Sequence, residues 1–122
     1  RPRLKLMETE YKVKLYDILQ TQAPFGRTSE DGSPSAETIR QLINDKWDKY
    51  EKIIISFENI VSMTRTFVDE AFAKLLEDHT LVEFNQKIHF PDAKESTVKE
   101  INAAFKLRLK IIKARMERES EL

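Results

Sequence analysis

Residues 35–77 carry the sequence SAETIRQLINDKWDKYEKIIISFENIVSMTRTFVDEAFAKLLE, which contains neither glycine nor proline. Apolar residues recur through it at intervals of three and four positions, a spacing that places side chains on one face of an α-helix. The eleven recurring positions, all apolar except Thr64, are Ile39, Ile43, Trp47, Tyr50, Ile54, Phe57, Val61, Thr64, Val68, Phe72 and Leu75. We therefore expect one long amphipathic helix over residues 35–77.

Three further helices are expected on either side of this stretch. The same spacing at Leu4, Met7, Tyr11, Leu15 and Ile18 predicts a helix over residues 4–22. Both glycines of the chain fall in residues 23–34, which we expect to form a flexible loop. The capping-box pattern at Thr80 and Glu83 predicts a short helix over residues 81–89. Asp92 is the expected cap of a last helix over residues 93–119.

These elements predict an all-α fold, because no stretch shows strand-like alternation framed by turns. The expected architecture is an elongated antiparallel helical bundle with three long helices and one short helix. Residues 1–122 would form a single helical domain or a fragment of a larger one. Because the first residue is Arg1 and not Met, we expect an excised or processed piece of a longer chain.

The composition argues against several classes of function. Twenty-one basic residues balance twenty-one acidic ones, so bulk charge does not hold the chain on nucleic acid. The absence of cysteine excludes disulfides and zinc–thiolate sites. Two glycines within one loop exclude a phosphate-binding or dinucleotide-binding glycine motif. We expect a chain that is not an enzyme, with no cofactor, no metal and no small-molecule substrate, located inside the cell in the cytoplasm.

The histidine and hydroxyl side chains, which are the candidates for metal binding or catalysis, are explained by ordinary structural roles. His79 and His89 are ten positions apart and lack the i, i+4 or Glu-x-x-His spacing of metal ligands, so interhelix or surface placement is expected. The loop hydroxyls are expected to serve in turns and helix caps, with Ser33 and Pro34 opening the long helix. They are Thr28, Ser29, Ser33 and Ser35.

The last helix has an uneven charge. Residues 106–115 contain five basic residues and no acidic one, and these five are the candidate interaction residues: Lys106, Arg108, Lys110, Lys113 and Arg115. One interpretation is that this helix packs beside residues 36–77, which carry eight acidic and six basic residues. The other is that an amphipathic basic helix binds anionic lipid, RNA or an acidic partner helix.

Part of the sequence resembles the helical stalk of dynamin-superfamily proteins, including the antiviral Mx relatives. The resemblance lies in ETIRQLINDKW at residues 37–47, FENIV at residues 57–61 and FVDEAF at residues 67–72. It extends over about residues 36–118. It implies assembly through stalk surfaces and no chemistry within these residues.

The function expected from the sequence is that of a non-catalytic helical module for protein–protein association. Its partner is another protein or a second copy, contacted through apolar helix faces, as in a stalk-like piece of a larger protein. The alternative is an anion-binding module that contacts membrane lipid or RNA through its basic helix.

Overall fold

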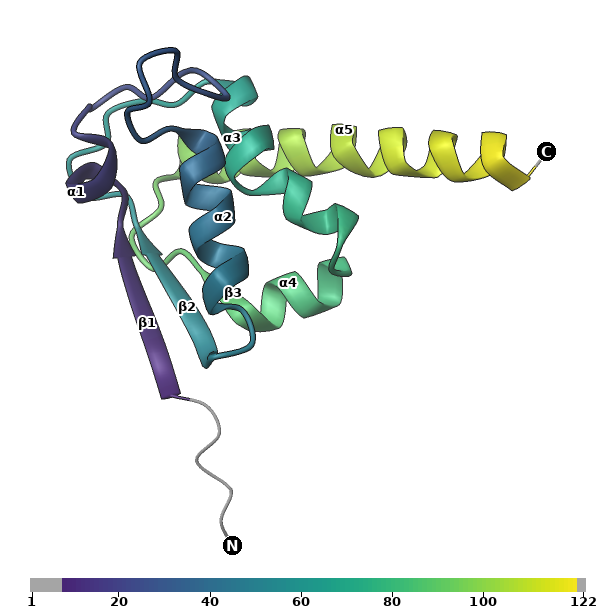
Figure 1. The fold of residues 1–122 in the computed structure, drawn as a ribbon, viewed down its shortest axis with the longest axis horizontal. Helices are drawn as coiled ribbons and strands as arrows, with labels where there is room; N and C mark the ends of the chain where they lie inside the picture. Colours follow the sequence, from purple (N-terminus) through teal and green to yellow (C-terminus); the bar gives the residue numbers. More distant parts are fainter. Residues whose placement is uncertain (1–7, 121–122) are drawn as a thin grey trace, which may run out of the picture.

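A computed structural model describes residues 8–120 and shows a mixed α/β fold (Figure 1). Its elements follow the order β1 (Glu8–Lys14), α1 (Leu15–Leu19), α2 (Ala36–Lys46), β2 (Tyr50–Ser56), α3 (Arg65–Ala71), the 3-10 helix η1 (Ala73–Glu77), α4 (Leu81–Lys87), β3 (Ile88–His89) and α5 (Glu95–Ser120). The prediction of an all-α, elongated antiparallel bundle is therefore wrong. A three-stranded parallel sheet replaces parts of three of the expected helices.

The sheet has the strand order β1-β2-β3, and its residues alternate between a buried and a polar face. Tyr11 pairs with Ile53 and Val13 pairs with Ile55, and of these four only Tyr11 is not fully buried. The neighbouring pair, Lys12 and Ile54, lies on the opposite face, where Lys12 is exposed. The helices therefore cover one face of the sheet, and the core lies between the two layers.

The long helix expected over residues 35–77 is interrupted by β2. Tyr50–Ser56 includes three consecutive isoleucines, and β-branched side chains favour extended backbone. The helical pattern used Tyr50 and Ile54, yet Ile53 and Ile55 are the fully buried residues of this strand. The alternation continues at buried Phe57, so the true period here is two and not three or four.

The helix expected over residues 4–22 is mainly a strand. β1 occupies Glu8–Lys14 and only the five residues of α1 are helical, ending at Gln20 in the left-handed conformation. Residues 4–7 lie outside the described part of the chain. Parallel pairing needs a crossover between two strands, and α1, residues 20–35 and α2 supply it between β1 and β2.

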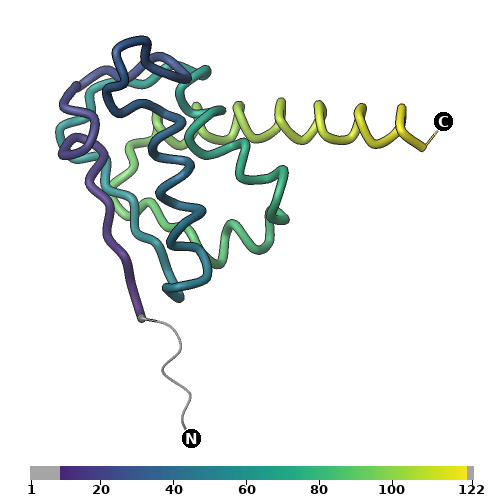
Figure 2. The backbone as a smooth tube through the Cα atoms, viewed as in Figure 1, coloured from purple at the N-terminus to yellow at the C-terminus, as the bar shows by residue number. Residues whose placement is uncertain are grey.

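Two long segments meet at the end of the strands. Residues 20–35 run beside the segment that follows β2, as the backbone path in Figure 2 shows. Val61 N donates to Gln22 O over 2.7 Å, and Thr64 Oγ1 donates to Phe25 O over 2.6 Å. The loop between α1 and α2 is thereby fixed to the segment that leads into α3.

The later boundaries lie closer to expectation. α4 begins after Thr80, whose side chain forms the predicted capping box with Glu83, but residues 88–89 form β3. Asp92 does not cap α5, because it accepts hydrogen bonds from Ser56 Oγ and Phe57 N at 2.7 and 3.0 Å. Ser35, not Ser33, is the cap of α2.

α5 is the longest element and extends beyond the rest of the domain (Figure 1). Its buried residues are Ile101, Ala104, Phe105 and Arg108, all in its first fourteen positions. Within residues 8–120, no helix combines the length and apolar character needed to cross a bilayer.

Candidate functional site

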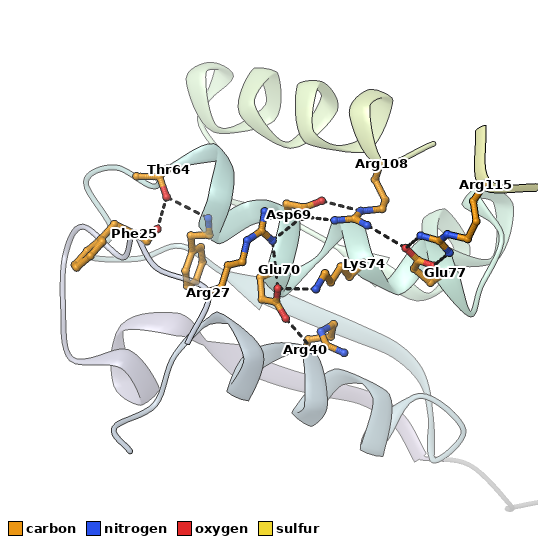
Figure 3. A network of polar contacts seen from close by, with 11 residues as sticks. Phe25, Arg27, Arg40, Thr64, Asp69, Glu70, Lys74, Glu77, Arg108 and Arg115 are labelled. Carbon is orange, nitrogen blue, oxygen red and sulfur yellow. Dashed lines mark hydrogen bonds and ion pairs between the residues drawn. The ribbon is translucent and has the colours of Figure 1, made fainter. Parts of the chain in front are cut away.

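Two neighbouring carboxylates of α3 are buried beneath α5 and α2. Asp69 is 7% exposed and Glu70 is 3% exposed. Burying a charge is unfavourable unless it is paired and hydrogen-bonded. α3 is oriented by Thr64, whose side chain accepts from Phe67 N over 3.1 Å. Both carboxylates consequently point into a group of basic side chains from other elements (Figure 3).

Asp69 lies between two arginines. Arg108 of α5 donates from Nε to Oδ1 over 3.0 Å and makes a second contact from Nη2 to Oδ2. Arg27 of the loop donates from Nη1 to Oδ2 over 2.7 Å. Burial alone raises the pKa of Asp69, but these hydrogen bonds and charges outweigh it and leave the pKa below its ordinary value. The carboxylate is therefore ionised and holds α5 and the loop to α3.

Glu70 pairs with three cationic side chains, one of which, Arg27, it shares with Asp69. Arg27 Nη1, Arg40 Nη2 and Lys74 Nζ lie 3.2, 2.9 and 2.9 Å from its oxygens. Burial raises the pKa of Glu70, and the hydrogen bonds from Lys74, Arg40 and Arg27 reverse that effect, so the pKa is lowered. Arg40 lies on α2, so this carboxylate ties α2 to α3.

Glu77 of η1 pairs with Arg108 and Arg115 of α5. It accepts from Arg108 Nη1 over 3.0 Å and from Arg115 Nη1 and Nη2 over 2.7 and 3.2 Å. The Arg115 hydrogen bonds are the main reason that the pKa of Glu77 is lowered. A carboxylate that stays ionised between guanidinium groups is a weak base, which suits a structural role better than acid–base catalysis.

The five basic residues predicted as an interaction face divide into two sets. Arg108 and Arg115 face the domain and pair with Asp69 and Glu77. The other three are exposed, and no carboxylate within residues 8–120 lies within ion-pair distance of them: Lys106, Lys110 and Lys113. The two interpretations of the basic helix thus apply to different side chains of α5.

An apolar groove lies beside the three lysines, between α4 and α5. Its volume is about 380 Å³. The residues that line it are Leu81, Phe84, Asn85, Phe90, Val98, Ile101, Asn102, Phe105, Lys106 and Leu109. Leu81, Val98 and Leu109 keep 38–42% of their surface exposed, so the groove offers apolar area to a ligand. We call it the α4–α5 groove.

A second, more open hollow of about 710 Å³ lies over the loop hydroxyls. Asp31 accepts hydrogen bonds from Ser29 Oγ and from Ser33 N and Oγ, and the Ser29 hydrogen bond contributes most to lowering the pKa of Asp31. Ser35 N donates to Thr38 Oγ1 over 3.0 Å at the start of α2. These contacts are turn and cap contacts, as the sequence predicts for this cluster.

The histidines are held in separate contacts. His79 stacks on Trp47 with 3.6 Å between ring centroids, and its Nε2 lies 3.2 Å from Asn44 Oδ1. His89 Nε2 lies 3.2 Å from Gln86 O. In the part of the chain that the structure describes, no three His, Cys, Asp or Glu side chains gather as a metal site would require.

The ion-pair network was not predicted from the sequence. Arg27 was assigned only to a loop, and Asp69, Glu70 and Arg40 were hidden in the expected helix. One signal was present: Asp69 and Glu70 interrupt the run FVDEAFA, residues 67–73, whose five apolar members are all buried. Charges within such a run are buried with it and require cationic partners.

Comparison with known proteins identifies one family. A family model described as "STAS-like domain of unknown function (DUF4325)" matches residues 35–98, which are 64 of the 122 residues. No curated protein and no solved structure matches significantly. The match, together with the parallel sheet, overturns the resemblance to a dynamin-superfamily stalk, and with it the description of the chain as all-α and stalk-like.

Proposed function

The chain belongs to this STAS-like family of unknown function, and we propose that it is a non-catalytic module that binds another protein chain through α5. The observation that carries the proposal is the sparsely packed C-terminal half of α5, whose contacts to the domain include the Arg115–Glu77 ion pair and the partly buried Ile112. After Arg108 no residue of α5 is buried, yet the helix continues to Ser120. Leu109 and Met116 are exposed apolar residues on this part, and Ile112 is only partly buried.

Helix physics makes such an arm a candidate for partner binding. Twelve residues, 109–120, form about three turns, and isolated helices of this length are marginal in water. Packing of an apolar face provides most of the stability of such helices. A partner on Leu109, Ile112 and Met116 would supply that packing.

The contacts of the carboxylates favour a non-catalytic role. Asp69, Glu70 and Glu77 are each paired with at least two cationic groups, and their pKa values are lowered. We further propose that the chain acts in the cytoplasm.

A second candidate function is anion binding to membrane lipid or RNA. The three exposed lysines of α5 favour it: Lys106, Lys110 and Lys113. It is weaker than the first because Arg108 and Arg115 already pair within the domain, leaving three of the five predicted charges.

Photo-crosslinking in the native host tests the proposal. A benzophenone amino acid replaces Met116 on the arm or, as the matched control, Phe25, an equally apolar and exposed loop residue. We expect the Met116 position to give a discrete protein adduct that is lost when Leu109→Asp is added, and Phe25 to give none. No adduct at Met116, identical adducts at both positions, or an adduct removed by nuclease would contradict the proposal.

A further inference from the structure

The apolar side chains that line the α4–α5 groove are followed by further apolar side chains on the C-terminal part of α5, and we call the whole row the apolar seam. Phe84 of α4 packs edge-on against Phe105 of α5 at 4.9 Å, and this pair forms the floor of the groove. Val98, Phe105, Leu109, Ile112 and Met116 follow one another at intervals of three, four and seven positions, so they share a helix face. The first three line the groove, Ile112 is partly buried against the core, and Met116 is 62% exposed at the end of the row.

We propose that this seam binds an amphipathic helix of another protein whose polar residues are mainly acidic. The inference rests on the proposed function and names the partner's chemistry. Val98 and Met116 are eighteen residues apart, a rise of about 27 Å at 1.5 Å per residue, so the seam suits a helix of about eighteen residues. Apolar side chains at every third or fourth position of that helix would enter the groove.

The exposed lysines of α5 indicate that the partner surface is negatively charged. Lys106 lines the groove, and Lys110 and Lys113 follow on the same side of α5 at helical spacing. These lysines lack an ion-pair partner within residues 8–120. Acidic residues along one edge of the bound helix would pair with them, which favours this partner and its orientation.

The same charges argue against two occupants from this chain. A second α5 would bring six basic residues and one acidic residue over positions 106–118, so the two helices would repel each other. Residues 1–7 contain Arg1, Arg3 and Lys5 and no acidic residue. Neither complements the lysines of the groove.

The shape of the surface favours a helix over a membrane. A concave groove with aromatic residues at its floor receives side chains from a partner, as in helix-in-groove recognition. A bilayer surface would contact the lysines but gain little from Phe84, Phe105 and Ile101, which are 2–7% exposed.

The test uses a defined probe. A fluorescein-labelled eighteen-residue peptide carries leucine at every third and fourth position and glutamate on its flanks; one control peptide replaces each glutamate by lysine, and another scrambles the order. Fluorescence anisotropy measures binding to the full chain at low and high salt. We expect saturable binding of the acidic peptide only, weakened at high salt because the lysine contacts are exposed.

Two variants and a matched control locate the site. Lys106→Glu with Lys110→Glu and Lys113→Glu should weaken binding at least about tenfold, and Leu109→Glu by about the same factor. The control changes three exposed basic residues elsewhere and should alter affinity by less than about twofold. It combines Lys12→Glu, Lys49→Glu and Lys52→Glu.

Several results would overturn the inference: no binding of the acidic peptide, equal binding of the lysine peptide, equal loss in the control variant, or dimerisation through the seam in sedimentation. Tighter binding to phosphatidylglycerol vesicles than to the peptide, lost in the same lysine variant, would assign the surface to a membrane. If Met116 still gives its Leu109-dependent protein crosslink, the proposed function stands and only the acidic helix is wrong. Loss of both results would reject both.

Discussion

Two sides of α5 both carry positive charges, but one side forms ion pairs within the domain and the other is exposed to solvent. Arg108 and Arg115, seven positions apart, face the domain and pair with Asp69 and Glu77. Lys106, Lys110 and Lys113 lie along the other side and remain exposed. The rotation of the helix against α3 and η1 therefore separates structural cations from available ones.

The choice of residue agrees with this separation. A guanidinium is planar and presents several donors, so Arg108 contacts two carboxylates at once. An ammonium group is a strongly hydrated point charge, which suits exposed positions that exchange partners. A basic run in a sequence should accordingly be read residue by residue, with the helix face of each charge considered.

Replacing Arg108 with alanine should have the largest effect on stability. Arg108 is 8% exposed, and loss of its guanidinium leaves Asp69 paired only with Arg27. Removing one member of a buried ion pair costs about 3 kcal/mol or more. Urea unfolding of the variant should show that loss in the free energy of unfolding. A loss below about 1 kcal/mol would show that the network contributes little.

Acidification should act on the same side of α5. The pKa values of Asp69, Glu70 and Glu77 are lower in the folded chain than their ordinary values of 3.8, 4.5 and 4.5. The stability that these carboxylates provide is thus complete above about pH 5 and falls as the pH drops through the folded pKa values. Urea unfolding between pH 7 and pH 3 should show this decline, with a shallower one in Arg108→Ala. Equal declines in the two proteins would show that the pH dependence of stability does not come from the ion pairs of Arg108.

Replacing Arg115 with alanine should have a smaller effect than the Arg108 change. Its hydrogen bonds to Glu77 are exposed to solvent, and exposed ion pairs contribute little to stability. Thermal unfolding should show a melting temperature between those of the parent chain and Arg108→Ala. A melting temperature at or below that of Arg108→Ala would mean that the arm of α5 depends on Glu77.

The triple change of Lys106, Lys110 and Lys113 to glutamate should have the smallest effect on stability. Exposed substitutions away from special features stay within about 0.5 kcal/mol. Urea unfolding should therefore match the parent chain, even where binding is lost. A clear destabilisation would show that the lysines stabilise the fold and are not reserved for a partner.

The sequence predicted the fold only in part, and the failures have a common cause. In residues 50–56 the chosen spacing of Tyr50, Ile54 and Phe57 satisfied a helical period, while Ile53, Ile55 and Phe57 satisfied a strand period equally well. The absence of glycine and proline favoured the wrong choice, because the turn between α2 and β2 uses Trp47, Asp48 and Lys49. Of the predicted caps, the Thr80–Glu83 capping box is confirmed, whereas Ser33 and Asp92 do not cap α2 and α5.

The surface of α5 was predictable as a basic helix but not as two different sides. Sequence spacing places Arg108 and Arg115 on one helix side, yet only the packing of α5 on α3 shows that this side faces Asp69. The carboxylate partners of these two arginines lie 31 to 39 residues away, and Arg27, 42 residues from Asp69, comes from a loop without periodicity. Long-range pairing of this kind leaves no local pattern.

Nuclear magnetic resonance titration with the acidic helical peptide examines the division of α5 in one experiment. Backbone amide and methyl signals of the full chain are followed as the peptide is added. The account predicts shifts at Val98, Lys106, Leu109, Ile112 and Met116 and along α4, with little change at Asp69 and Glu77. Shifts centred instead on the loop of residues 23–35, on the polar face of the sheet or on the arginine side of α5 would contradict it.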